Sequence, residues 1–416
     1  MEVPTASGGC STRVPPLPDQ LGAGSIAGAM TSRLSVAREL LEDLKLRLPG
    51  MVDLLGDFVS IESPSHDKVA VDAMGKRVAD EWRARGARVT TLTQKLRGNY
   101  VRAELIAEKG HRLRPILVLG HLDTVYPKGT LERMPLRVTR GRTFGPGTFD
   151  MKGGLVIALF AVEALRALKF PLRRNLIFLW TSDEEIGSES SRRIIEREAR
   201  KCEAVFVLEP ALGSGGSLKT QRKGVGEIQI SVTGRAAHAG INPQDGLNAV
   251  HELAFQIARL TELNDPSHGI TVQANIIEGG SATNVVAEKA SARIDVRFAH
   301  AADARPLERK LFGLRPVLKG TRIVVSGGLN RPPLERTAAI EELFEKAREL
   351  AGQMGFALEE AATGGGSDGN FTAALGVPTL DGMGAVGDEA HGSGEHVVNR
   401  ALPERAALLA SLMCTL

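Results

Sequence analysis

Short apolar runs alternate with helical repeats along the first half of the chain. Pro115–Gly120, Leu176–Trp180 and Ala204–Leu208 are apolar runs bounded by polar residues, which is typical of strands buried on both faces of a sheet. Met151–Phe170 carries leucine and valine at helical spacing, and Ser190–Ala199 is also expected to be helical. Strands separated by helices predict an α/β fold, with a mostly parallel sheet covered by helices on both faces.

The pattern changes near Gly224. Glu227–Thr233 alternates polar and apolar residues, as expected for a strand with one buried face. A helix, two strands, a helix and a strand are expected next, at Gly246–Leu263 and near residues 270–277, 290–299, 303–314 and 321–326. This β-α-β-β-α-β order is ferredoxin-like, so an α+β domain, residues 222–330, is predicted to interrupt the α/β domain. The α/β domain would comprise residues 34–221 and 331–416, with further helices at Ser35–Val59 and Glu335–Met354.

The N-terminal residues 1–33 are rich in Gly, Pro, Ser and Ala and are expected to be disordered. They lack the charged start and continuous apolar core of a signal peptide, and Met30 is an alternative start. No apolar run approaches the roughly 18 residues of a membrane span. We therefore expect a cytoplasmic protein without membrane contact.

Charge and cysteine content exclude some classes of function. The 416 residues include 52 basic and 49 acidic side chains, for a net charge of +3, and only 4% are aromatic. This balance does not favour nucleic acid as a partner. The three cysteines, Cys10, Cys202 and Cys414, lie far apart, which argues against a disulfide framework and against cysteine-bound zinc.

Acidic residues and histidines follow the predicted strands. His121 and Asp123 follow the first strand, Asp183, Glu184 and Glu185 the second, and Glu209 the third. Asp150 immediately precedes a helix, and His391 follows the apolar segment Val377–Leu380. Ligands of open parallel sheets bind at the carboxyl ends of the strands. Donors of this kind, without sulfur, suit zinc, cobalt or manganese.

Each of these residues also has a purely structural interpretation. His121 could be a hydrogen-bonded core histidine, Asp150 a helix N-cap and Glu209 a solvated loop residue. Asp183 is interpreted as a turn residue. The glycine-rich stretch Gly364–Asp368 could be a flexible loop or a phosphate cradle, although it lacks the lysine of a P-loop. Taken together, these interpretations do not explain why acids and histidines gather where a parallel sheet places its ligand site.

Six segments resemble a known family: GHLDTVYP, GPGTFDMKGG, TSDEEIGS, LEP, GRAAHAG and GGGSDGNF. In this order they are similar to the M20 metallopeptidases, nearest to the glutamate carboxypeptidase (carboxypeptidase G) branch, from about Leu54 to the C-terminus. The resemblance implies a zinc-peptidase-like catalytic domain with an inserted dimerisation domain. It therefore implies a homodimer.

The resemblance also implies two zinc ions and a role for each candidate. His121 and Glu209 would hold one ion, Glu185 and His391 the other, and Asp150 would bridge both. Asp123 would orient the imidazole of His121. Glu184 would be the general base that takes a proton from a water between the ions. Because neighbouring side chains of an extended chain point in opposite directions, Glu184 and Glu185 need not share a role.

Further residues match family positions around the substrate. His238 would reach the site of the partner subunit and stabilise the oxyanion. Asn284 matches a family position, Arg297 would clamp a substrate carboxylate, and Gly366 would allow close backbone approach. A polar loop histidine and a solvated arginine are the alternatives for His238 and Arg297.

Two positions near the proposed ligands need separate mention. Met151 stands where many relatives have a second acidic residue, and no ligand is lost by this difference. His396 is an alternative to His391 as a ligand, and we prefer His391 for its position in the motif.

These expectations converge on a two-zinc hydrolase. It would cleave an amide bond next to a free carboxylate in a small molecule or short peptide and release a C-terminal amino acid, glutamate by resemblance. Lys219 and Arg331 are candidates for reading the side chain of that residue. The alternatives are an N-acyl amino acid deacylase of the acetylornithine or succinyl-diaminopimelate type and a non-catalytic carboxylate or metal binder. The presence of Glu184 beside the full ligand set counts against a non-catalytic binder, because a binder needs no base. A nucleotide-binding module is a weaker alternative.

Overall fold

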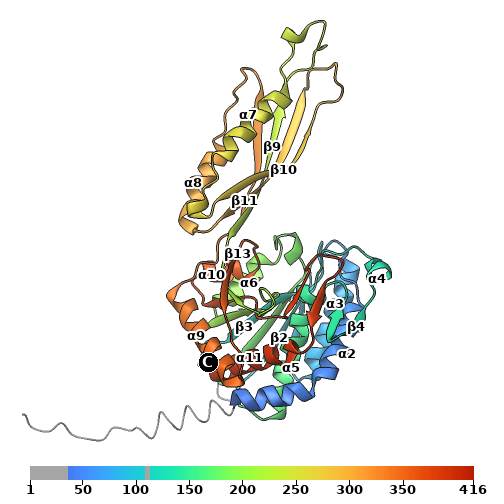
Figure 1. The fold of residues 1–416 in the computed structure, drawn as a ribbon, viewed down its shortest axis with the longest axis vertical. Coiled ribbons are helices and arrows are strands. Elements are labelled where there is room, and N and C mark those ends of the chain that lie inside the picture. The colour runs from blue at the N-terminus through green and yellow to red at the C-terminus, as the bar shows by residue number, and fades with distance from the viewer. Residues whose placement is uncertain (1–35, 108–112) are drawn as a thin grey trace, which may run out of the picture.

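The computed structural model describes residues 36–107 and 113–416, and these form two bodies joined at one end (Figure 1). The inserted body is Gly224–Arg331, and the α/β body comprises the described residues on either side of it. The N-terminal segment expected to be disordered lies outside the described residues. No helix in the described ranges is long and apolar enough to cross a membrane.

The central sheet of the α/β body has six strands in the order β1-β2-β6-β3-β7-β14. Their bounds are Arg88–Leu92, Tyr100–Leu105, Leu176–Thr181, Ile116–His121, Ala204–Val207 and Thr379–Leu380, respectively. β6, β3, β7 and β14 are parallel, whereas β1 and β2 form an antiparallel edge. The predicted mostly parallel sheet is confirmed. The antiparallel edge was not predicted, because β1 and β2 contain polar residues and no continuous apolar run.

Helices cover both faces of this sheet. One core lies against α2 (Leu48–Val59), α3 (Lys68–Ala84), α5 (Gly153–Ala167), α9 (Ala338–Met354) and α11 (Ala401–Thr415). A second core on the opposite face includes residues of α6 (Arg192–Ala199) and α10 (Gly369–Ala374). Alternate residues of β3 belong to different cores, Ile116 and Val118 to the first, Leu117 and Leu119 to the second. Burial on both faces therefore explains the apolar run that predicted this strand.

Short strands outside the central sheet fix the loops at its carboxyl edge. One small sheet has the order β15-β16-β5-β4, with bounds Gly387–Asp388, His396–Val398, Arg142–Phe144 and Arg137–Thr139. The short helix α4 (Thr130–Arg133) precedes it. The pairing of β5 with β16 brings the loop before Asp150 beside the loop that carries His391. A second pair, β8 (Leu218–Arg222) with β13 (Glu360–Thr363), leads from Glu209 toward the inserted body.

The inserted body is an antiparallel sheet with two helices on one face (Figure 1). Its strands have the order β10-β11-β9-β12, with bounds Thr271–Gly279, Lys289–Phe298, Gly224–Thr233 and Arg322–Arg331. The helices are α7 (Ala249–Thr261) and α8 (Ala301–Phe312). These helices and the inward residues of the strands form a separate hydrophobic core. The element order along the chain is the β-α-β-β-α-β order expected from the sequence.

Candidate metal centre

His121, the last residue of β3, lies at the centre of the acidic cluster. Its Nε2 atom is 3.2 Å from Asp150 Oδ1 and 3.4 Å from Glu209 Oε1. Its Nδ1 atom donates a hydrogen bond to the carbonyl oxygen of Asp123 at 2.9 Å. This bond places one ring proton on Nδ1, which leaves Nε2 as the nitrogen that would bind an ion on the acidic side. The ring is buried, so solvent does not compete for Nε2.

Asp123 contacts the ring of His121 through both its backbone and its side chain. Its carboxylate is 3.5 Å from His121 Nδ1, so the backbone carbonyl makes the closer contact with the ring. The carboxylate accepts hydrogen bonds from Ser65 Oγ at 2.7 Å and from the backbone N–H groups of Glu184 and Glu185 at 3.3 Å. Asp123 thus connects the end of β3 to the turn that carries both glutamates.

Asp150 lies between the two histidines. Its Oδ1 atom faces His121 Nε2, and its Oδ2 atom is 3.4 Å from His391 Nε2. The backbone is held from the other side, because Glu395 Oε1 accepts the N–H groups of Phe149 and Asp150 at 2.8 and 3.0 Å. A carboxylate that bridges two metal ions offers one oxygen to each ion, and Asp150 directs one oxygen to the side of each imidazole.

His391 and Glu185 form the second side of the cluster. His391 Nε2 is 3.3 Å from Glu185 Oε2. The imidazole is 49% exposed, so this side of the cluster opens to solvent. The other carboxylate oxygen of Glu185, Oε1, is buried and has no hydrogen-bond partner among the described residues. A buried carboxylate oxygen without a partner is costly, and a cation would relieve that cost.

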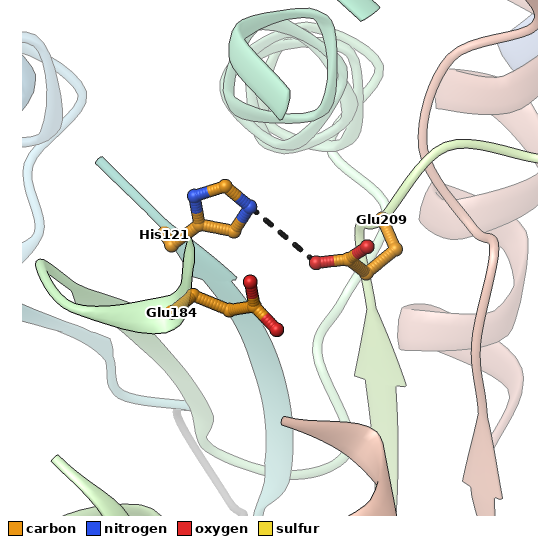
Figure 2. A group of neighbouring side chains, drawn as sticks. All are labelled: His121, Glu184 and Glu209. Carbon is orange, nitrogen blue, oxygen red and sulfur yellow. Dashed lines mark ion pairs between the residues drawn. The ribbon is translucent and has the colours of Figure 1, made fainter. Parts of the chain in front are cut away.

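Glu184 and Glu209 lie on the first side of the cluster. Figure 2 shows Glu209 pointing at the ring of His121, with the carboxylate of Glu184 beside them. Ligand atoms of His121, Glu184 and Glu209 lie within 4.8 Å of one another, as do those of His121, Asp150 and Glu185. The geometry alone therefore permits Glu184 as a ligand as well as a base.

The pKa values follow from burial and from the local excess of carboxylates. Asp150 and Glu185 raise the pKa of His391 to about 10. Burial opposes a charge on His121, but the carboxylates around it outweigh burial and raise its pKa. Burial raises the pKa of Glu185 to about 7. The cluster thus favours added positive charge, and its oxygen and imidazole donors fit zinc, cobalt or manganese.

A buried arginine holds Glu184. Arg331 Nη2 is 3.0 Å from Glu184 Oε1. Burial raises the pKa of Glu184, and the charge of Arg331 opposes that rise. A second buried arginine, Arg222, pairs with Asp381 at 2.7 Å and lies 3.6 Å from Glu209.

The turn after β6 corrects one premise taken from the sequence. Glu184 and Glu185 lie in a 3₁₀ turn, η2 (Glu184–Ile186), not in an extended segment. Their carboxylates still diverge, because successive residues of such a turn point in different directions around its axis. Asp183 accepts hydrogen bonds from the N–H of Ser190 at 2.9 Å and from its hydroxyl at 2.6 Å, as a turn residue does.

The predicted substrate residues lie outside the cluster. His238 and Asn284 are exposed neighbours in the inserted body, where Ala239 N–H donates to the Asn284 carbonyl oxygen at 2.9 Å. His238 Nδ1 accepts the N–H groups of Gly240 and Ile241 at 3.1 Å, so a neutral ring carries its proton on Nε2. Arg297, near the end of β11, pairs with Asp295 at 2.7 Å. Its Nη1 donates to the carbonyl of Gly364 at 3.3 Å, at the start of the glycine-rich stretch.

Two further residues near the cluster, His396 and Met151, have well-defined surroundings. His396 stacks on Phe144, with ring centroids 4.9 Å apart, and its Nδ1 donates to the Gly394 carbonyl at 2.9 Å. It contributes to neither ligand group found among the described residues. Met151 packs in the core, where its sulfur accepts the N–H of His121 at 3.1 Å.

Sequence reasoning missed two supporting residues, Glu395 and Arg222. Glu395 contacts the cluster across 245 residues of sequence and Arg222 contacts it from β8, and neither lies in a spacing pattern that signals its role. Tyr126 donates to Glu395, so this carboxylate links three separate segments.

A comparison with family models identifies the chain. The model of peptidase family M20/M25/M40 matches residues 117–415, well over half of the sequence. The chain belongs to this family. The resemblance stated from the motifs is therefore confirmed, and the protein is an M20-type metallohydrolase.

Individual relatives agree with this assignment. Carboxypeptidase G2 of Pseudomonas sp. (strain RS-16) is 29% identical over 378 residues, 88% of this chain and 89% of that protein. Succinyl-diaminopimelate desuccinylase of Dechloromonas aromatica (strain RCB) is 29% identical over 333 residues, 73% of this chain and 84% of that protein. The YXEP protein of Bacillus subtilis, a dinuclear metal-binding peptidase from the M20 family, has a TM-score of 0.65 and 14% identity. The match covers 89% of this chain and 98% of that one, and it supports the fold alone.

Proposed function

We propose that this M20 enzyme is a two-zinc hydrolase that releases a C-terminal amino acid, with glutamate favoured, from a small amide or short peptide. The observation that carries the proposal is Asp150, whose two carboxylate oxygens face different imidazoles, 3.2 Å from His121 and 3.4 Å from His391. His121 and Glu209 would hold one zinc ion, Glu185 and His391 the other, and Asp150 both. The ions would supply positive charge that polarises the amide carbonyl and lowers the pKa of the attacking water.

Glu184 is proposed as the general base. Arg331 occupies its Oε1 atom, which leaves Oε2 to accept the proton of the attacking water. The same carboxyl would then deliver the proton to the leaving amine. Proximity to His121 and Glu209 puts Glu184 beside the ligands, as this role requires.

His238 is proposed to act across a homodimer. Its hydrogen-bonded contacts are with neighbouring residues of the inserted body, and the hydrogen bonds to Nδ1 leave Nε2–H as a free donor direction. An N–H donor can stabilise the oxyanion of the tetrahedral intermediate. We propose that the donor enters the site of the partner subunit.

The free carboxylate of the substrate is proposed to bind between the two bodies. Arg297 already contacts the glycine-rich stretch through Gly364, and Gly366 packs against Arg331. Asn284 would contribute an amide from the inserted body. A guanidinium and small residues together favour a planar carboxylate over a neutral group.

Lys219 on β8 supports an acidic side chain on the released residue. Its side chain is buried, and among the described residues no ion pair or hydrogen bond engages its ammonium group. Burial and the nearby Arg222 lower its pKa, while Asp381 and Glu209 oppose that effect. A buried cation next to the ligand Glu209 would gain a partner from the side-chain carboxylate of glutamate. Similarity to carboxypeptidase G2 agrees with release of a C-terminal residue.

The second candidate is an N-acyl amino acid deacylase, favoured by the similarity to succinyl-diaminopimelate desuccinylase.

A substrate panel separates the carboxypeptidase from the deacylase. Zinc-loaded enzyme, with a chelated control, would be given N-acyl-glutamates, folate-like amides, dipeptides and N-acetyl-ornithine. Chelator-sensitive release of glutamate from acyl or pteroyl substrates supports the carboxypeptidase. Turnover of N-acetyl-ornithine alone assigns the enzyme to the deacylases.

A further inference from the structure

Arg331 is the last residue of β12, where the chain returns from the inserted body to the α/β body. Its side chain is buried, with 5% of the residue exposed, and its guanidinium lies over the ring of Phe371 at 4.8 Å. Nη2 donates to Glu184 Oε1 at 3.0 Å and to the Glu184 carbonyl oxygen at 3.2 Å. One nitrogen therefore binds both the side chain and the backbone of the same residue.

We infer that Arg331 is a positioning residue that fixes the carboxylate of Glu184 for proton transfer; this inference rests on the proposed role of Glu184 as the base. A glutamate side chain has several rotatable bonds, so an unsupported carboxylate would sample many orientations. Two contacts from one rigid guanidinium select a single orientation relative to the backbone. Oε1 is held, and Oε2 is directed to the reacting water.

The guanidinium is itself fixed by the protein. Nη1 donates to Asp368 Oδ1 at 2.8 Å, and Nη2 also donates to Ser188 Oγ at 2.9 Å. Ser188 Oγ in turn donates to Asp368. Both terminal nitrogens are thus committed to protein acceptors, and only 6% of the side chain is exposed, which together favour positioning over direct binding of a substrate carboxylate.

The end of β12 holds the whole turn that carries the base. Asn330 Nδ2 donates to the carbonyl oxygen of Gly187 at 2.9 Å, next to the contact of Arg331 with Ser188. The two adjacent residues therefore bind both ends of the segment from Glu184 to Ser188. The position of the base is set from the strand that leaves the inserted body.

The first test is Arg331→Met. We expect kcat to fall by about 10²-fold, as for a catalytic group displaced by about 1 Å, with KM nearly unchanged and two zinc ions per chain retained. Arg192→Met is the matched control, because Arg192 also lies over Phe371 at 4.8 Å but contacts the carbonyl of Asn330 instead of Glu184. The control should keep its activity. A higher KM with unchanged kcat would make Arg331 a substrate contact, and loss of zinc would make it structural; either result overturns the inference.

The second test combines Arg331→Met with Glu184→Gln. If Arg331 acts through Glu184, the double variant should be no slower than Glu184→Gln alone. If the losses of kcat in the two single variants instead multiply in the double variant, the inference is overturned. Arg331→Lys keeps a charge near Oε1 but not the fixed fork, so kcat should be intermediate. If Arg331→Met has wild-type activity and Glu184→Gln is inactive, only the positioning role of Arg331 is overturned. If Glu184→Gln is active, the proposed mechanism is overturned as well.

Discussion

Glu184 and Glu185 are adjacent in the chain, yet their carboxylates have different partners. Glu184 Oε1 lies 3.0 Å from the guanidinium of Arg331, and Glu185 Oε2 lies 3.3 Å from the imidazole of His391. The backbone N–H groups of both donate to the carboxylate of Asp123, so the turn itself is anchored at one point. Two like charges can occupy neighbouring positions because each faces a different cation.

This division of roles predicts the behaviour of Glu184→Gln. The amide keeps the size of the side chain but cannot take a proton, so kcat should fall by roughly 10²- to 10⁴-fold. Zinc content, measured by mass spectrometry of the metal, should remain at two ions per chain. Glu185→Gln is the matched variant and should lose zinc from one site. If Glu184→Gln instead loses zinc while Glu185→Gln keeps it, the two roles are reversed.

Zinc binding should release protons. The pKa of His391, raised to about 10, means that its ring is a cation at pH 7 in the metal-free protein, and the raised pKa of His121 favours the cation there too. A ligand imidazole must be neutral, so zinc displaces a proton from each cationic ring, and zinc affinity rises with pH until the rings are neutral. Glu185, with a pKa of about 7, adds a fraction of a proton. Calorimetry in buffers of different ionisation enthalpy measures this release.

The variants that check the proton count are His391→Asn and His396→Asn. The first removes a ring from the cluster and should reduce the release by about one proton. The second removes a ring that stacks on Phe144 outside the cluster and should leave the release unchanged. An equal effect of the two variants would contradict the assignment of His391 as a ligand.

The role proposed for His238 predicts complementation between two inactive variants. In a mixed dimer of His238→Ala and Glu184→Gln chains, one of the two sites has an intact base and receives an intact histidine from the partner. Random co-assembly should therefore restore roughly a quarter of the wild-type sites. Activity of co-expressed, separately tagged chains measures this recovery. No recovery in a proven mixed dimer would place His238 in its own chain's site or remove it from catalysis.

The order of elements could be predicted well where burial imposes a simple pattern. β3, β6 and β7 are buried at every residue, and β9 alternates, so each pattern follows directly from its surroundings. The ligands could be collected because they follow these strands. The residues that hold the candidate ligands in place could not be predicted from the sequence. Glu395 contacts Asp150 across 245 residues of sequence, and Arg331 contacts Glu184 across 147. Such contacts depend on how distant loops meet, and no local periodicity records them.

Lys219 should determine selectivity for the released residue. In Lys219→Met the side-chain carboxylate of glutamate loses its proposed partner, so kcat/KM for glutamate release should fall by about 10- to 100-fold, the usual value of a charged hydrogen bond. Release of alanine from the corresponding N-acyl compound should be unchanged. Lys223→Met, four residues along the same segment, is the control. Equal losses for both substrates would show that Lys219 supports Glu209 and does not read the substrate.

Gly366 should be sensitive to a single added methyl group. A Cβ atom there would lie 2.8 Å from Val225 Cγ2 and 3.0 Å from Arg331 Cδ, so one of these side chains must move. Gly366→Ala should lower kcat/KM by roughly 10-fold or more, because displacement of Arg331 releases Glu184 from its orientation. Gly364→Ala is the control, since no atom of the described residues outside its immediate neighbours lies within 4 Å of its added Cβ. Zinc content should be normal in both. Wild-type kinetics for Gly366→Ala would mean that the loop and Arg331 adjust without disturbing Glu184. A loss confined to kcat would show that the packing of this loop determines the position of Glu184.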